Sequence, residues 1–264
     1  MRKAELIVFT DLDGTLLDHE TYSHAAAAPA LQRLRDRGIP VILASSKTAA
    51  EIAALRAEIG LSAYPAIVEN GAGILPAHAD SAGAAPDYAR IRAALDRVPP
   101  ELRRHFTGFG DMTDAGVAHS TGLPLDQARL ARQRSYSEPG EWAGSDTERA
   151  AFEKCLADEG ITARYGGRYL TLSLGGTKAD RMDEIAAAYG NPPRIALGDA
   201  PNDLEMLLAA DMPVLIRNPH AKPLPPLPEK QAGRILKSTK TGPSGWNEMI
   251  HSLLSKAQSR QIGA

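Results

Sequence analysis

The chain has 264 residues, of which 43% are hydrophobic and 23% are charged, and its formal net charge is −2 at pH 7. This length suits one large domain or two modest ones with a full core, and the composition is that of an ordinary globular enzyme. Because so small a net charge attracts neither nucleic acid nor an anionic membrane, we expect neither as a partner.

The sequence specifies no oligomeric state, and it indicates a cytosolic protein. Cys155 is the single cysteine, so no internal disulfide is possible, and the helical pattern of residues 151–156 favours a packed, inert thiol. Arg2 and Lys3 precede an apolar run, but Asp11 and Asp13 interrupt it too early for a signal peptide. No stretch approaches the length needed to span a membrane.

The first predicted element is a strand over residues 6–9, followed at once by Asp11-Leu12-Asp13-Gly14-Thr15. Where a strand ends and the chain turns, residues two apart converge on one pocket, so Asp11 and Asp13 can share a substrate. Gly14 permits the turn, and Thr15 offers a hydroxyl and an N–H to an anion. The alternative is a structural Asx-type turn.

The next elements alternate between helix and strand. Pro29 and Gly38 bracket a helix, and a buried strand follows at 41–44. Thr48 and Glu51 have the spacing of a capping box, which predicts a helix to about residue 58.

A third strand is predicted at 66–68, before Glu69-Asn70-Gly71. This alternation implies a parallel sheet, and a site at the carboxyl ends of its strands. We expect Asp11, Ser45 and Asn70 to lie at that edge.

The pattern changes between about residues 78 and 176. A linker-like segment at 80–86 precedes helical stretches, and residues 169–174 alternate as a half-solvated antiparallel strand does. We therefore expect a core of residues 1–83 and 177–264, interrupted by an inserted α+β domain at 84–176.

The core pattern returns after the insertion. Apolar residues at helical spacing and a strand at 195–197 lead into Gly198-Asp199-Ala200-Pro201-Asn202-Asp203. The proline-rich segment 223–228 is predicted to be an extended surface loop before a last strand and helix.

Two acidic strand ends in one sheet predict a metal site. Carboxylates at close range repel unless a cation lies between them, and Mg²⁺ suits carboxylates together with phosphate oxygens. The predicted ligands are Asp11, Asp13, Asp199 and Asp203. Lys178, which opens the preceding helix, can offset the charge of a bound phosphate, and Ser45 can cradle an anion at a helix N-terminus. Taken singly, a lysine at a helix start is more often a solvated surface charge, and Ser45 by itself is more often a helix cap; it is their combination with the acidic strand ends that favours a site.

In chain order, Asp11/Asp13, Ser45, Lys178 and Asp199/Asp203 resemble the four motifs of the haloacid dehalogenase superfamily. This resemblance implies an α/β fold, with a Rossmann-like parallel-sheet core. It also implies that Asp11 attacks phosphorus to form an aspartyl-phosphate, while Asp13 protonates the leaving oxygen and then activates water. Carboxylates are competent nucleophiles at neutral pH, and Mg²⁺ and Lys178 supply the charge neutralisation that the reaction needs.

The inserted segment resembles the superfamily's C2B cap, which chooses the substrate. Ser45-Ser46-Lys47-Thr48 and Glu69-Asn70-Gly71, together with two cap segments at 131–138 and 166–169, resemble mannosyl-3-phosphoglycerate phosphatases. The resemblance extends to about Ile216. Ala179 departs from it, since glycine is expected after the lysine.

A glycosyl phosphoglycerate presents a carboxylate and sugar hydroxyls besides its phosphate, so it needs a basic fork and neutral polar groups. The predicted substrate-binding residues are Lys47, Thr48, Asn70, Gly71, Arg134, Ser137, Glu138 and Arg168. Each also has a structural interpretation, as a surface ion pair, a cap or a turn residue.

The sequence therefore predicts a Mg²⁺-dependent phosphatase that converts mannosyl- or glucosyl-3-phosphoglycerate to the glycosylglycerate, a compatible solute. The alternatives are a phosphomannomutase or a broader sugar-phosphate phosphatase of the same superfamily. A binding protein on an inactivated scaffold would be expected to lack Asp11 or Asp13, and both are present. Walker, nucleophile-elbow and zinc-binding motifs are absent from the sequence.

Overall fold

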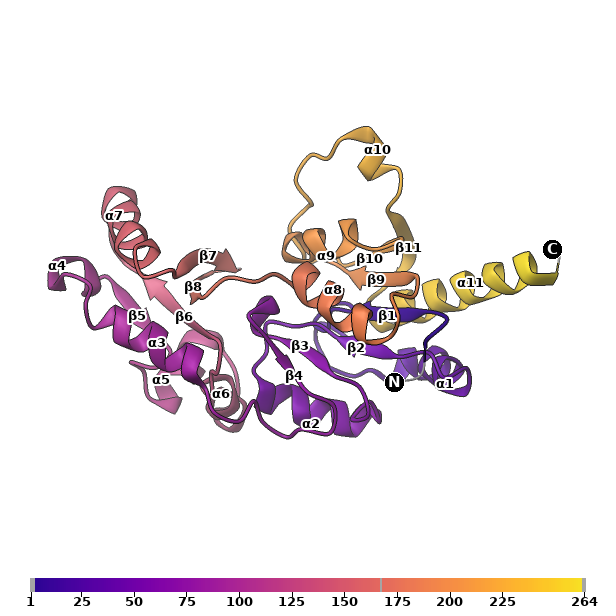
Figure 1. Cartoon of the computed structure of the whole chain (residues 1–264), viewed down its shortest axis with the longest axis horizontal. Coiled ribbons are helices and arrows are strands. Elements are labelled where there is room, and N and C mark those ends of the chain that lie inside the picture. The colour runs from indigo at the N-terminus through magenta and orange to yellow at the C-terminus, as the bar shows by residue number, and fades with distance from the viewer. Residues whose placement is uncertain (1–2, 167, 263–264) are drawn as a thin grey trace. The chain divides into compact units, whose positions relative to one another are not determined.

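A computed structural model describes residues 3–166 and 168–262, and the chain forms two compact units (Figure 1). Unit 1 comprises Met1–Ser45 and Lys178–Ala264, and unit 2 comprises Ser46–Thr177. The return to unit 1 falls within one residue of the predicted position. The departure from it comes earlier than residue 83, because residues 46–83 pack with the inserted segment.

Unit 1 contains a five-stranded parallel sheet in the order β11-β10-β9-β1-β2. Its strands are β1 (Ile7–Thr10), β2 (Val41–Leu43), β9 (Arg194–Gly198), β10 (Met212–Arg217) and β11 (Leu236–Thr241). The residues of β1 and β2 are all buried, as expected for parallel strands covered on both faces. The predicted α/β fold with a parallel central sheet is confirmed.

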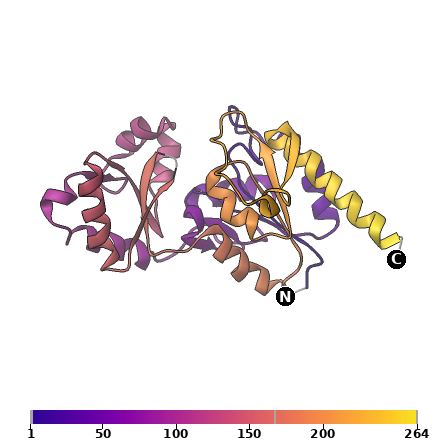
Figure 2. The ribbon, with the colours of Figure 1, turned by 90° about the horizontal axis from the view of Figure 1, so that it is seen from above.

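Helices α9 and α11 pack against this sheet, α1 packs with α11, and α8 packs with α9. The helices of unit 1 are η1 (Ala25–Ala27), α1 (Ala28–Asp36), α8 (Lys178–Ala188), η3 (Pro201–Asp203), α9 (Leu204–Leu208), α10 (Glu229–Ala232) and α11 (Gly242–Ile262). Figure 2 shows α11 as one long helix at the C-terminal end of the chain. The proline-rich segment forms no helix or strand before α10, as predicted.

Unit 2 contains a four-stranded antiparallel sheet in the order β5-β6-β8-β7. Its strands are β5 (Phe106–Gly108), β6 (Ser137–Trp142), β7 (Thr162–Gly166) and β8 (Tyr169–Ser173). Along β8 the buried residues are Leu170 and Leu172, which is the predicted alternation. The accompanying helices are α3 (Pro86–Leu95), α4 (Pro100–Arg103), α5 (Asp114–Thr121), α6 (Leu125–Ala131) and α7 (Asp146–Ala157).

The predicted placement of the third strand was wrong. β3 (Ala66–Val68) does not join the parallel sheet of unit 1; it pairs antiparallel with β4 (Gly73–Leu75) in a separate two-stranded sheet. The reason is the turn η2 (Glu69–Gly71), in which all three residues have positive φ and reverse the chain. Asn70 therefore lies in unit 2, not at the sheet edge that carries Asp11.

Residues 46–83 are held in unit 2 by contacts with the inserted segment. The predicted capping box is present at the start of α2 (Ala49–Ile59), where Thr48 Oγ1 accepts the Glu51 N–H. Thr48 Oγ1 also lies 3.0 Å from the Leu130 carbonyl oxygen near the end of α6. Across the described residues, no helix is both long enough and apolar enough to span a membrane.

Candidate active site

In unit 1, β1 and β9 place two acidic turns side by side. Asp11 follows β1, and its N–H donates to the Leu197 carbonyl of β9 at 2.8 Å. The adjacent Thr10 hydroxyl accepts Trp246 Nε1–H from α11 at 3.0 Å. Asp199 immediately follows β9, so paired parallel strands bring the two carboxylates to one edge of the sheet.

Gly14 permits the close packing of the first turn. Its φ is +80°, and a Cβ there would lie 2.3 Å from Asn218 Nδ2 and 2.9 Å from Asp199 Oδ2. Both the backbone conformation and the space therefore require glycine. The turn also brings the Thr15 hydroxyl within 2.8 Å of Asp199 Oδ1.

Three carboxylates meet around one ammonium group. The structure brings together Asp11, Asp199 and Asp203, each offering an oxygen within 4.8 Å of the others, and all three residues are buried. Lys178 Nζ donates to Asp11 Oδ1 and to Asp203 Oδ1, each at 2.7 Å. Lys178 thus lies at the start of α8 but inside the cluster, which excludes its interpretation as a surface charge.

The hydrogen bonds distinguish Asp203 from the other two carboxylates. Asp203 Oδ2 accepts the N–H groups of Asp199 and Ala200, at 3.1 and 3.2 Å, while its Oδ1 accepts Lys178. Asp199 accepts one donor on each oxygen, from Thr15 and from Asn218, which leaves lone pairs on both. Asp203 therefore anchors Lys178 and its own turn, and Asp11 and Asp199 have more capacity for a further cation.

The electrostatics of the cluster favour such a cation. Burial raises the pKa of Asp11 well above its ordinary value, and the neighbouring Asp203 and Asp199 add to the effect while Lys178 opposes it. Burial also raises the pKa of Asp199. Burial alone would lower the pKa of Lys178, but Asp11 and Asp203 outweigh it and hold that pKa above its usual range. When all groups ionise, three carboxylates against one ammonium leave two negative charges, and their oxygen donors suit Mg²⁺.

The two remaining predicted residues of unit 1 follow the ends of β1 and β2. Asp13 is half-buried in the turn and does not belong to the three-carboxylate group, so its carboxylate stays a predicted metal ligand. Ser45 is buried just beyond the end of β2. The sequence reasoning missed Asn218, although its position directly after β10 was a usable signal.

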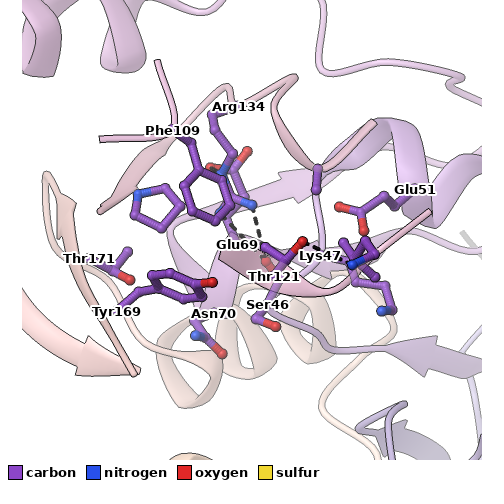
Figure 3. Close-up of a pocket in the computed structure, with 13 residues that line it drawn as sticks. Ser46, Lys47, Glu51, Glu69, Asn70, Phe109, Thr121, Arg134, Tyr169 and Thr171 are labelled. Atoms are coloured by element: carbon purple, nitrogen blue, oxygen red, sulfur yellow. Dashed lines mark hydrogen bonds and ion pairs between the residues drawn. The ribbon is translucent and has the colours of Figure 1, made fainter. Parts of the chain in front are cut away.

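Unit 2 has a separate cavity of about 180 Å³, shown in Figure 3. Its lining includes three of the predicted substrate-binding residues, Lys47, Asn70 and Arg134. Phe109 and Tyr169 also line it, in an edge-to-face pair with ring centroids 5.1 Å apart. The full lining is Ser46, Lys47, Glu51, Glu69, Asn70, Phe109, Thr121, Leu123, Ala131, Arg134, Pro139, Tyr169 and Thr171.

The other predicted residues do not line this cavity. Thr48 caps α2, and Gly71, with φ of +92°, completes the turn after β3. Ser137 is buried and donates to Glu69 Oε2 at 2.7 Å. Arg168 is exposed, donates to the Thr121 carbonyl at 2.8 Å and lies over the Tyr169 ring.

Glu138 belongs to the opposite face of β6. Pro139 lines the cavity, and side chains alternate along a strand, so its neighbour Glu138 points away from it. The Glu138 carboxylate is fully buried and accepts the Gly110 N–H at 2.7 Å and Arg92 at 3.3 Å. Burial raises its pKa.

The chain is similar to known proteins over nearly its whole length. Residues 8–84 match the haloacid dehalogenase-like hydrolase family. Two relatives are named glucosyl-3-phosphoglycerate/mannosyl-3-phosphoglycerate phosphatase. The one from Persephonella marina is 32% identical, over 96% of this chain and 98% of its own, and the one from Methanococcoides burtonii is 34% identical, over 95% and 97%.

A solved structure from Bacteroides thetaiotaomicron, described as a phosphatase of the same superfamily, shares the fold at 19% identity. Its TM-score is 0.59, and the match covers 96% of this chain and 95% of that one.

Proposed function

The chain belongs to the glucosyl-3-phosphoglycerate/mannosyl-3-phosphoglycerate phosphatase family of haloacid dehalogenase-like hydrolases, a family of phosphoric monoester hydrolases, and we propose that it removes the phosphate of a glycosyl-3-phosphoglycerate. The observation that carries this proposal is the contact of Lys178 Nζ with Asp11 Oδ1, inside a buried cluster of carboxylates. The products are the glycosylglycerate and inorganic phosphate.

Asp11 is the proposed nucleophile. Lys178 holds Oδ1, so the same carboxylate can present its other oxygen to phosphorus. Attack forms an oxygen–phosphorus bond to Asp11 and breaks the ester bond between phosphorus and the glycerate oxygen. The Lys178 ammonium favours the ionised, nucleophilic form of Asp11 against the effect of burial.

Asp13 is the proposed acid and base. It lies two residues after Asp11, in the turn that Gly14 permits. Asp13 donates a proton to the departing glycerate oxygen and then takes a proton from water. The water attacks phosphorus, which frees inorganic phosphate and restores the Asp11 carboxylate. Ser45 is proposed to hold a phosphate oxygen.

Mg²⁺ is the proposed cofactor, and the donors present fit it. Asp11 and Asp199 would hold it through carboxylate oxygens, with Asp13 completing the acidic set and Asp203 contributing charge. When bound, the cation supplies charge neutralisation to the phosphoryl group. Thr15 and Asn218 keep the Asp199 carboxylate in one orientation for this purpose.

Discrimination among substrates is proposed to reside in the cavity of unit 2. Arg134 and Lys47 supply positive charge for a carboxylate, and Asn70 supplies neutral polar atoms for a sugar. The Asn70 Oδ1 atom is buried and has no hydrogen-bond partner among the described residues, so an incoming hydroxyl would satisfy it. Four further predicted residues are proposed to support the walls of the cavity: Thr48, Gly71, Ser137 and Glu138. Arg168 is proposed to contact the substrate on the exposed side of the cavity.

The test is phosphate release from a panel of substrates by the purified protein. The panel contains mannosyl- and glucosyl-3-phosphoglycerate, 3-phosphoglycerate, mannose phosphates and p-nitrophenyl phosphate, each with and without Mg²⁺. We expect the highest kcat/KM with the two glycosyl compounds. Equal kcat/KM on simple sugar phosphates would favour the broader phosphatase. Activity that requires a sugar bisphosphate would favour a phosphomannomutase.

A further inference from the structure

Glu69 is a buried carboxylate at the centre of a dense set of contacts in unit 2. Its Oε1 accepts the Ser135 N–H at 2.8 Å. Its Oε2 accepts the Ser137 hydroxyl at 2.7 Å and the Tyr136 N–H at 3.2 Å. Arg134 Nε lies 3.3 Å from the same oxygen, as an ion pair without hydrogen-bond geometry. One side chain thus contacts four consecutive residues of the opposing segment.

The backbone that carries Glu69 is strained. Glu69 and Asn70 have φ values of +52° and +58°, in the left-handed region that residues with a Cβ rarely adopt. Such strain persists only where surrounding contacts enforce it, and it is concentrated at functional sites. The conformation places Glu69 against the 134–137 segment and Asn70 in the lining of the cavity.

Arg134 is the cation that this arrangement fixes. Its Nη2 donates to Ser137 Oγ at 2.8 Å, and its two Nη atoms lie 3.4 and 3.5 Å from the Ser46 carbonyl oxygen. Its side chain is only 7% exposed, yet it lines the cavity (Figure 3). A guanidinium has five N–H donors, and the one short hydrogen bond is made by Nη2, so Nη1, whose single contact with Ser46 is long, is the donor group most open to a ligand.

We propose that Glu69 is a positioning residue, which holds the Arg134 fork in the one orientation that receives the carboxylate of the substrate. This inference rests on the proposed function. A charge-assisted hydrogen bond to a carboxylate is strongest from a guanidinium already fixed in orientation, because a free arginine side chain must lose rotamer entropy on binding. Glu69 acts through Arg134 and makes no contact with the ligand itself.

The first measurement compares two substrates in Glu69→Gln, which keeps the size of the side chain and removes its charge. We expect KM for mannosyl-3-phosphoglycerate to rise by about tenfold or more, the loss typical of a charge-assisted hydrogen bond. We expect kcat/KM for p-nitrophenyl phosphate, which has no carboxylate, to stay within about twofold. Equal losses on both substrates would overturn the proposal, because they would show a structural role only.

The second measurement asks whether Glu69 acts through Arg134. In an Arg134→Ala background, Glu69→Gln should add little to the rise in KM, because the group that it positions is already gone. Independent, multiplying effects of the two substitutions would overturn the proposal. The matched control is Asp111→Asn, which removes another carboxylate of unit 2 that is held by two arginines and a backbone N–H outside this cavity. It should leave KM unchanged.

A third measurement needs no activity. The guanidinium signal of Arg134 in an NMR spectrum, assigned with Arg134→Lys, should be sharp in the wild type, where the side chain is fixed, and should broaden in Glu69→Gln, where it becomes mobile. An unchanged signal would overturn the positioning role. If the wild type fails to hydrolyse both glycosyl-3-phosphoglycerates while this signal behaves as expected, the proposed substrate is wrong and the Glu69–Arg134 relationship stands.

Discussion

Lys178 Nζ lies 2.7 Å from Oδ1 of Asp11, although 167 residues separate the two in the chain. The parallel pairing of β1 with β9 and the start of α8 bring them together. A buried ammonium in this position neutralises one carboxylate and favours its ionised form. Lys178 therefore offsets the free-energy cost of burying the Asp11 carboxylate, and it also favours the ionised form on which the proposed reactivity of Asp11 depends.

We expect Asp11→Asn to fold and to lose at least about 100-fold in kcat, equivalent to roughly 2.7 kcal/mol of barrier. An amide does not attack phosphorus, but it fits the same space and can still accept a hydrogen bond from Lys178. The measurement is steady-state hydrolysis of p-nitrophenyl phosphate, with circular dichroism as the check on folding. A variant that retained more than a tenth of the wild-type rate would remove Asp11 from the role of nucleophile.

We expect Lys178→Met to lower kcat by a similar order and also to destabilise the protein. Methionine fills the volume but leaves Asp11 and Asp203 facing each other without a cation, and removing one partner of a buried ion pair costs about 3–5 kcal/mol. Urea unfolding at pH 7 measures the loss.

If Asp203 is the main source of repulsion in Lys178→Met, adding Asp203→Asn should recover part of the stability and little of the activity. A double variant as unstable as Lys178→Met would contradict the electrostatic explanation.

We expect Mg²⁺ to stabilise the wild type, by about 2.7 kcal/mol at a hundredfold excess over its Kd. The raised pKa values of Asp11 and Asp199 mean that protons compete for the same oxygens, so the gain should shrink as pH falls. Thermal unfolding with and without Mg²⁺ measures this gain in stability, and Asp199→Asn should remove most of it.

We also expect EDTA to abolish hydrolysis. Ca²⁺ should not restore it, because its looser coordination misplaces the reacting groups.

The cluster of carboxylates around Lys178 was predictable because its signals are local. Each carboxylate follows an apolar strand, and parallel strands bring their carboxyl ends to one edge, so Asp11, Asp199 and Lys178 could be assigned to one site from strand ends and a helix start. The capping box at Thr48 is a four-residue pattern and was equally readable.

Long-range pairing was not predictable in the same way. The apolar run of β3 fits a parallel or an antiparallel neighbour equally well, and the choice depends on the turn at Glu69, Asn70 and Gly71; the Asn-Gly pair was a usable hairpin signal, whereas the positive φ of Glu69 had none. The partners of Glu69 lie 65–68 residues further along the chain, so no neighbouring residue in the sequence indicates its role. Likewise, the direction of the Glu138 side chain could not be predicted, because it depends on the long-range register of β6 with β8.

The Asp111 cluster predicts a pH dependence of stability. Burial alone would raise the pKa of Asp111, but hydrogen bonds from Arg92, Arg103 and the Gly108 N–H outweigh it and hold that pKa below its ordinary value. A carboxyl whose pKa is lowered by folding stabilises the protein above its unfolded pKa and loses that contribution as pH falls through its folded value. Asp111→Asn should therefore cost about 1 kcal/mol at pH 7, a modest value because the cluster is partly solvated.

Urea unfolding of wild type and Asp111→Asn between pH 7 and pH 3 checks this sign. The difference between them should be constant at neutral pH and should shrink below about pH 4. A difference that grew toward acid would mean that the three donors do not govern the titration of Asp111.

The two arginines proposed for substrate recognition should behave differently. Arg134 lines the cavity and is nearly buried, whereas Arg168 is exposed and its guanidinium donates to the Thr121 carbonyl and lies over Tyr169. Arg134→Ala should raise KM for mannosyl-3-phosphoglycerate by about tenfold to a hundredfold and lower kcat, because remote binding energy orients the phosphate for attack. Arg168→Ala should change KM by less than about threefold, the scale of an exposed contact. Both should leave hydrolysis of p-nitrophenyl phosphate nearly unchanged. A larger effect from Arg168→Ala than from Arg134→Ala would move the proposed carboxylate site out of the cavity and onto the exposed side of Tyr169.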